Sequence, residues 1–185
     1  YNSDYIEIFN RGSGAVSLAG MSLQYASATG TGAFGGGSAQ LTELPAVTVA
    51  PGAYFLVAEA TGAVGVPLTP DHSDLTPISM SATAGKVALV TGTTSLGCNG
   101  GSIPCDAAAL ARIVDLVGYG SANFYEGAAA AAAPSNTTAV LRANGGRTDT
   151  DNNGADFAVD APNPRGSTAP PPPPEPPVCA GPGVT

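Results

Sequence analysis

Glycine and proline interrupt this chain along its whole length and limit it to short elements of secondary structure. The 185 residues include 25 glycines and 17 prolines, which are the two residues that disfavour helices most strongly. Between them lie short runs in which apolar and polar residues alternate, the period of a strand with one buried face. Hydrophobic residues still make up 43% of the chain, which is enough for a core. We therefore predict an all-β domain rather than a helical bundle.

Nine short runs carry this strand pattern. They are residues 5–10, 16–18, 21–25, 46–49, 54–59, 86–90, 113–117, 138–142 and 156–159. In the third run the alternation places Met21, Leu23 and Tyr25 on one face. The alanine-rich residues 128–133 are too few for a stable helix, so we expect a loop or a single turn there. Many short strands with regular turn signals are typical of a β-sandwich.

The composition changes after residue 166. Five consecutive prolines occupy residues 170–174, and two more follow Glu175. Such a run adopts an extended polyproline II conformation and acts as a stiff spacer. We predict a folded domain over residues 1–166 and a Pro-rich linker over residues 167–185, leading to a downstream domain of the same polypeptide. A disordered tail is the alternative, but Cys179 near the end favours a linker.

The three cysteines indicate an oxidising compartment. Cys98 and Cys105 enclose a short loop rich in Gly and Pro that could close into a disulfide, although two unrelated buried thiols are the alternative. Cys179 is left over, which suggests a partner outside this chain. Together with the single lysine and the abundant Thr, Ser, Gly and Ala, this pattern predicts a secreted, extracellular or cell-surface protein.

The charge balance disfavours some partners. With 6 basic and 14 acidic residues the formal net charge is −8. A phosphate backbone needs a basic surface, so we expect no strong binding of nucleic acid by this chain alone. No stretch reaches the roughly 18 apolar residues that a membrane span requires, and we expect none.

The residues that could carry catalysis do not form a recognisable set. His72 is the only histidine, and the Asp and Ser beside it in the chain cannot converge on it as a catalytic triad requires. Glu7 and Asp115 lie in predicted strands and could act as an acid and a base. Pairing with an arginine such as Arg112 or Arg142 is the simpler interpretation. We predict no catalytic residue.

One segment could hold a metal ion. Oxygen-bearing side chains fall at positions 1, 3, 5 and 12 of a calcium-loop pattern, namely Asp149, Asp151, Asn153 and Asp160. Gly154 suits the sharp turn at position 6. No helix pattern flanks the segment, which excludes an EF-hand, and the alternative is a turn in which Asp156 accepts hydrogen bonds from the backbone. Calcium at these four residues is the only cofactor that the sequence suggests.

Six blocks of sequence also occur in the order found in one protein family. The first three are DYIEIFN at residues 4–10, VSLAGMSL at residues 16–23 and VDLVGYG at residues 114–120. The others lie at residues 134–138, 149–157 and 162–165. Together they resemble the lamin-tail domain of secreted bacterial proteins, with Met21 where a Trp is usual.

The resemblance implies a fold and a setting. It implies an immunoglobulin-like β-sandwich that lacks enzymatic activity. Members normally have a strand before the first block, so we expect that this first strand is missing from the chain and that one sheet edge is unpaired. It also implies a place beside a nuclease or phosphoesterase of the endonuclease/exonuclease/phosphatase kind.

Three functions follow from this reading, in decreasing order of support. The first is a non-catalytic accessory or binding module of a secreted multidomain hydrolase, with a protein or a cell-surface polymer as ligand. The second is a stand-alone adhesion or structural protein of the cell envelope. The third is an enzyme in its own right.

Overall fold

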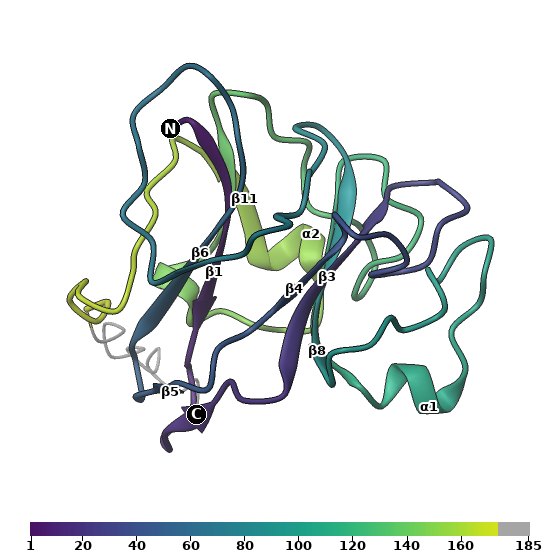
Figure 1. Cartoon of the computed structure of the whole chain (residues 1–185), viewed down its shortest axis with the longest axis horizontal. Helices are drawn as coiled ribbons and strands as arrows, with labels where there is room; N and C mark the ends of the chain where they lie inside the picture. Colours follow the sequence, from purple (N-terminus) through teal and green to yellow (C-terminus); the bar gives the residue numbers. More distant parts are fainter. Residues whose placement is uncertain (174–185) are drawn as a thin grey trace, which may run out of the picture.

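The chain folds into a β-sandwich with two main sheets (Figure 1). The computed structural model describes residues 1–173. The strands in this part of the chain are β1 (Ser3–Phe9), β2 (Val16–Ser17), β3 (Met21–Ser27), β4 (Leu41–Glu43), β5 (Thr48–Val49), β6 (Tyr54–Thr61), β7 (His72–Ser73), β8 (Gly85–Thr91), β9 (Ile113–Tyr119), β10 (Ala139–Arg142) and β11 (Phe157–Asp160). The short helical elements are α1 (Ala107–Leu110), η1 (Asn144–Gly146) and α2 (Asn153–Asp156).

The two main sheets differ in their strand pairing. The first has three strands in the order β1-β6-β7, with β1 antiparallel and β7 parallel to β6. The second has four antiparallel strands in the order β4-β3-β8-β9. Two small antiparallel pairs, β2 with β5 and β10 with β11, complete the described structure. Strands distant in sequence, such as β1 and β6, therefore lie side by side.

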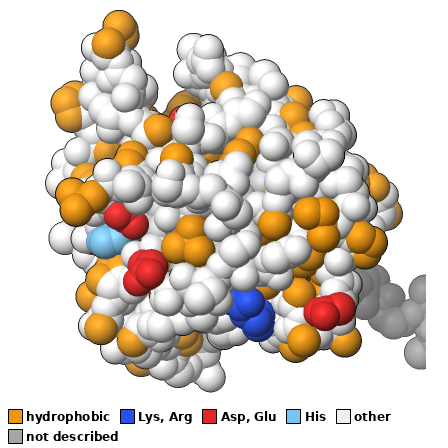
Figure 2. Space-filling view, turned by 45° about the vertical axis from the view of Figure 1, so that its right-hand side comes forward, with side chains coloured by type: hydrophobic (Ala, Val, Ile, Leu, Met, Phe, Trp, Pro, Cys, Tyr) orange, Lys and Arg blue, Asp and Glu red, His pale blue; other side chains and the backbone are white. Residues whose placement is uncertain are grey.

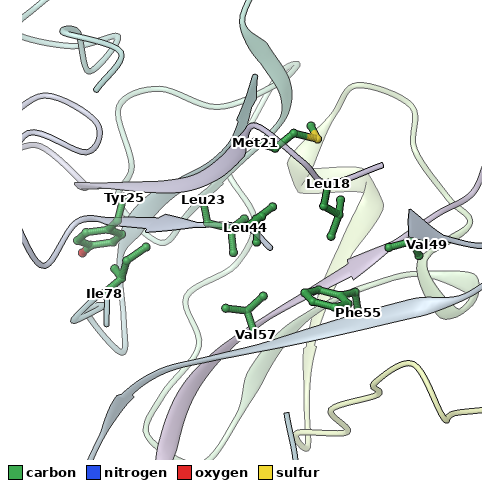
Figure 3. Close-up of a cluster of buried hydrophobic side chains, with 9 residues drawn as sticks. All are labelled: Leu18, Met21, Leu23, Tyr25, Leu44, Val49, Phe55, Val57 and Ile78. Atoms are coloured by element: carbon green, nitrogen blue, oxygen red, sulfur yellow. The ribbon is translucent and has the colours of Figure 1, made fainter. Parts of the chain in front are cut away.

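The main core lies between the two sheets (Figure 3). Figure 3 labels its buried side chains: Leu18, Met21, Leu23, Tyr25, Leu44, Val49, Phe55, Val57 and Ile78. The predicted alternation in β3 is confirmed, because Met21, Leu23 and Tyr25 all join this cluster. From the opposite sheet, β6 contributes Phe55 and Val57.

A second core covers the outer face of the four-stranded sheet. Phe34 and Leu96 come from loops and pack with Ala88, Val90 and Leu116 of the sheet. Because both of its faces are covered, β3 is buried at every position except Ser27. The same loops carry the cysteine pair and α1, so this side of the sheet is closed by irregular backbone rather than by another sheet.

The predicted β-sandwich is confirmed, and all nine predicted runs contain strand residues. The short elements β4, β7, α1, η1 and α2 were not predicted. The last run begins later than expected, because Asp156 ends α2 and β11 starts at Phe157. Residues 128–133 contain no helix, and Ala131 forms a bridge with Tyr119. None of the helices in residues 1–173 has the length and apolar character that a membrane crossing requires.

Candidate functional site

The aspartate-rich segment is organised around Asp156. This buried carboxylate accepts hydrogen bonds from the Thr150 N–H at 2.8 Å, the Thr150 hydroxyl at 2.7 Å and the Asn152 N–H at 3.3 Å. Burial alone would raise the pKa of Asp156, but these hydrogen bonds outweigh it and hold the pKa below its ordinary value. Asp156 therefore ties the turn together, as the alternative to calcium binding requires.

The four candidate calcium ligands do not converge. Asn153 is buried and points toward β9, where its Oδ1 accepts from the Gly118 N–H at 2.8 Å. Asp149 pairs with Arg11 at 2.8 Å and with Arg142. Residues 1–173 contain no group of three or more His, Cys, Asp or Glu side chains that could hold a metal ion together.

The remaining two candidates lie apart from any such cluster. Asp151 has a positive φ of 53° in the turn, a conformation that Asp tolerates better than most residues. Asp160 ends β11, where its Oδ1 accepts from the N–H of Ala161. Calcium binding by this segment stays a prediction.

Arg142 connects the segment to the four-stranded sheet. Its guanidinium donates to both carboxylate oxygens of Asp115, at 2.8 and 2.7 Å. It also contacts Asp149 at 3.0 Å and lies 4.4 Å from the centre of the Phe157 ring. Burial raises the pKa of Asp115, and the charge of Arg142 opposes that rise. Asp115 thus has the arginine partner that the simpler sequence interpretation expected.

Glu7 and His72 also have structural partners. Arg165, rather than Arg112 or Arg142, pairs with Glu7 at 2.6 Å and bonds it through its backbone N–H as well. His72 lies in β7, with its Nε2 3.1 Å from the carbonyl oxygen of Glu43. Asp71 beside it accepts from the Leu56 N–H and from Ser167. Glu7 and Asp115, the candidate acid and base, are thus each paired with an arginine.

Cys98 and Cys105 lie at bonding distance. Their sulfurs are 2.00 Å apart and their Cα atoms 5.1 Å apart. Between them, the buried Asn99 side chain accepts from the Gly101 and Ile103 N–H groups, which fixes the turn of the loop. Cys179 and the end of the predicted Pro-rich linker lie outside the described residues.

Three ionisable groups whose pKa is shifted by burial, two of them fully buried and Glu126 partly so, were missed by sequence reasoning. Lys86 is fully buried and donates to the Asn99 carbonyl at 2.8 Å and to Asn123 at 2.9 Å, and burial lowers its pKa. Burial raises the pKa of Glu59 to about 7 and that of Glu126 to about 7. For Glu59 and Lys86 the only sequence signal was a charged residue at the end of an apolar strand run, which also fits an exposed strand face. Glu126 lies in the loop after β9 and gave no such signal.

A groove of about 950 Å³ opens between β1 and β10. Apolar side chains of β3, β8 and β9 line it, including Leu23, Val87, Leu89 and Val117. The ion pair of Glu7 with Arg165 and that of Asp115 with Arg142 lie along it as well. This groove is a feature of the described structure that could receive another molecule.

Comparison with known proteins identifies the family. A family model described as Lamin Tail Domain matches residues 1–157. No curated protein and no solved structure gives a significant match. The matched span contains both main sheets and reaches the first residue of β11. Domains of this family have an immunoglobulin-like, non-catalytic fold, in agreement with the sandwich described above. Since the match covers far more than half of the chain, the chain belongs to the lamin tail domain family.

Proposed function

We propose that this domain is a non-catalytic accessory module of a secreted, multidomain bacterial protein, next to a nuclease or phosphoesterase domain. The observation that carries the proposal is how its acidic side chains are used. Glu7 and Asp115 are each held by an arginine, and Asp156 is held by backbone and hydroxyl donors. These carboxylates stabilise contacts between distant parts of the chain, which suits a scaffold better than a reactive centre.

Two further features support the proposal that the protein is secreted and has several domains. A disulfide between Cys98 and Cys105 suits an oxidising compartment outside the cytoplasm. The run of prolines at residues 170–174 would space this domain from a following one.

A stand-alone adhesive or structural protein of the cell envelope is the second candidate. The observation that favours it is the loop between β6 and β7. Val64 and Val66 in this loop, and Leu75 just after β7, expose most of their surface to solvent. Exposed apolar groups of this kind can contact a protein or a polymer.

A nuclease assay tests the absence of catalysis. We expect the purified 185-residue chain to hydrolyse neither DNA nor nucleotides with magnesium, manganese or calcium present, because its carboxylates are engaged in structural contacts. Turnover that follows the chain through two different chromatographic separations would contradict the proposal. Reading the complete polypeptide then separates the two candidates, because phosphoesterase motifs downstream favour the first and a surface anchor favours the second.

A further inference from the structure

The last residues that the structure describes lie against the domain rather than pointing away from it. Arg165 bonds Glu7 of β1 through both its backbone N–H and its side chain. Two residues later, the N–H of Ser167 donates to the carboxylate of Asp71 at 2.8 Å. In Figure 1 this yellow part of the chain lies on the same side of the molecule as β6. The chain is therefore held at two points before its proline run begins at residue 170.

One proline of the run is buried. Pro172 is shielded from solvent, whereas Pro171 and Pro173 on either side of it are exposed. The carbonyl oxygen of Pro172 accepts a hydrogen bond from the Arg147 guanidinium at 2.8 Å. Because proline has no N–H, the carbonyl is the only backbone group with which such a run can form hydrogen bonds. The domain thus contacts both parts of Pro172 that could be recognised, the ring and the carbonyl.

Two glycines allow the prolines to come this close. Gly145 of η1 has a φ of 66°, and a Cβ added to it would lie 2.7 Å from the Cβ of Pro172. Gly52 has a φ of 71°, and a Cβ added to it would lie 3.7 Å from the Cβ of Pro171. The left-handed backbone favours glycine at both positions. At Gly145 a side chain would also force the proline ring away from the surface.

Aromatic side chains hold this surface in place. The Tyr54 hydroxyl donates to the Gly145 carbonyl at 2.7 Å, and Arg165 donates to the same hydroxyl at 2.8 Å. The ring of Phe9 packs on that of Tyr54 with 4.8 Å between their centres. The Arg147 guanidinium lies 6.0 Å from the centre of the Phe9 ring. The groups that meet the proline run are therefore positioned by the fold, which lowers the entropic cost of binding.

The guanidinium of Arg147 is used on carbonyl oxygen although carboxylates are abundant. The chain has 14 acidic residues, and Arg11, Arg142 and Arg165 all form ion pairs. Within residues 1–173 Arg147 forms none, and its buried Nε has no hydrogen-bond partner. The donors of Arg147 are thus available to a segment that offers acceptors alone, as a run of prolines does.

From these observations we infer that the surface formed by Gly52, Tyr54, Gly145 and Arg147 is a recognition site for a polyproline II segment, and that the prolines at residues 170–173 of the same chain occupy it. Such a segment is extended before it binds, so that docking it costs little conformational entropy. The linker is then anchored as far as residue 173 instead of leaving the domain at residue 166. The inference goes beyond the accessory role and holds whether or not another domain follows.

The test uses the full chain, labelled for NMR, and a capped pentaproline peptide. In Pro172→Gly the run loses its buried ring and part of its stiffness, so we expect it to leave the site and the amide signals of Gly52 and Gly145 to shift. The peptide should then bind and return these signals toward their wild-type positions. The wild type should bind the peptide at least about tenfold more weakly, because its own segment competes at an effective concentration in the millimolar range.

Matched controls locate the site. Pro173→Gly alters the exposed neighbour in the same run and should leave the two glycine signals in place. Arg147→Ala, added to Pro172→Gly, should weaken peptide binding about tenfold or more, because a charged donor to the proline carbonyl is lost. Arg112→Ala in the same background removes another guanidinium that bonds a backbone carbonyl and should leave binding unchanged. A pentaserine peptide, which lacks the rings, should not bind.

Three results would overturn the inference. The first is the absence of nuclear Overhauser contacts between the Pro172 ring and Gly145 in the wild type, because the segment would then not occupy the site. The second is no binding of pentaproline to the folded Pro172→Gly chain. The third is equal binding of pentaserine, which would mean that proline is not recognised. Since Pro172→Gly alters no residue of either sheet, these results decide the matter even if Arg147→Ala does not fold.

Discussion

Glu59 is a buried carboxylate that joins the two layers of the sandwich. It lies on β6, and its Oε2 accepts from the Thr42 hydroxyl at 3.0 Å and from the Ile78 N–H at 2.7 Å. Thr42 belongs to β4 of the other sheet. The second carboxylate oxygen, Oε1, has no hydrogen-bond partner in the described structure. Burial therefore raises the pKa of Glu59 to about 7, although its two hydrogen bonds oppose the rise.

We predict that Glu59 makes the protein less stable as the pH rises from about 4.5 to about 7. A raised pKa means that the folded state binds the proton more tightly than the unfolded state, so the folded state loses this advantage as the proton leaves. The full effect is about 3 kcal/mol of unfolding free energy, since each pKa unit is worth about 1.4 kcal/mol. Glu59→Gln cannot ionise and should lose this part of the pH dependence.

Urea denaturation of both proteins at a series of pH values between these limits measures the difference. Glu126 titrates in the same range, so the comparison with Glu59→Gln is what isolates Glu59. The matched control is Glu43→Gln on the neighbouring strand β4, where the side chain is exposed and should not alter the slope. Identical pH dependence of wild type and Glu59→Gln would show that the buried carboxyl does not titrate here.

The sequence left two explanations open for the turn before β11. It could bind calcium, or it could be held by hydrogen bonds to Asp156. Asp156 accepts three hydrogen bonds there, and Asp149 is paired with arginines. We therefore predict that Asp156→Ala lowers the unfolding free energy by on the order of 2 kcal/mol, equally with chelator and with excess calcium. Thermal melting under both conditions measures this.

A second variant keeps the calcium alternative testable. Asp151→Gly removes a candidate ligand and suits the positive φ of 53° at that position, so we expect little change in stability. If calcium instead raised the melting temperature of the wild type and this variant lost the gain, calcium would bind the turn. At a hundredfold excess over the dissociation constant the gain would be about 2.7 kcal/mol.

The loop between Cys98 and Cys105 is the second element with a direct test. We predict one free thiol in the denatured, unreduced chain, because Cys98 and Cys105 are bonded and Cys179 is left over. Thiol counting with and without reductant should give one and then three. Three thiols without reductant would refute the bridge and weaken the case for secretion.

The sequence predicted the elements that local patterns define and missed those that depend on contacts between distant residues. The strands in residues 21–25 and 86–90 have alternating or continuous apolar residues, a local signal that needs no knowledge of the fold. β7 has only two residues and exists because Asp71 and His72 are held against β6 and β4. The buried role of Asn153 depends on contacts with Gly118 and Glu126 that are distant in sequence. No local pattern encodes such contacts.

Across the whole molecule, the few basic side chains serve the fold rather than a ligand. Lys86 is buried, and Arg11, Arg142 and Arg165 are paired with carboxylates. The remaining two basic residues donate to backbone carbonyls, Arg112 to Thr94 and Arg147 to Pro172. On the face seen in Figure 2, charged side chains are sparse and separated by apolar and uncharged ones. The net charge of −8 is thus not offset by a basic surface.

We accordingly predict weak binding to duplex DNA at physiological salt. Non-specific binders that do have a basic face reach dissociation constants of only about 10⁻⁴ to 10⁻⁶ M there, and this chain should bind less tightly still. A titration of labelled duplex at several salt concentrations measures both the affinity and its slope. Each phosphate contact contributes about 0.9 to the slope of log affinity against log salt, so a chain whose cations are engaged internally should give a slope close to zero. Submicromolar binding with a steep slope would contradict this prediction. It would mean that arginines such as Arg112 and Arg147 leave their carbonyl partners to bind phosphate, and that nucleic acid is a ligand of this chain.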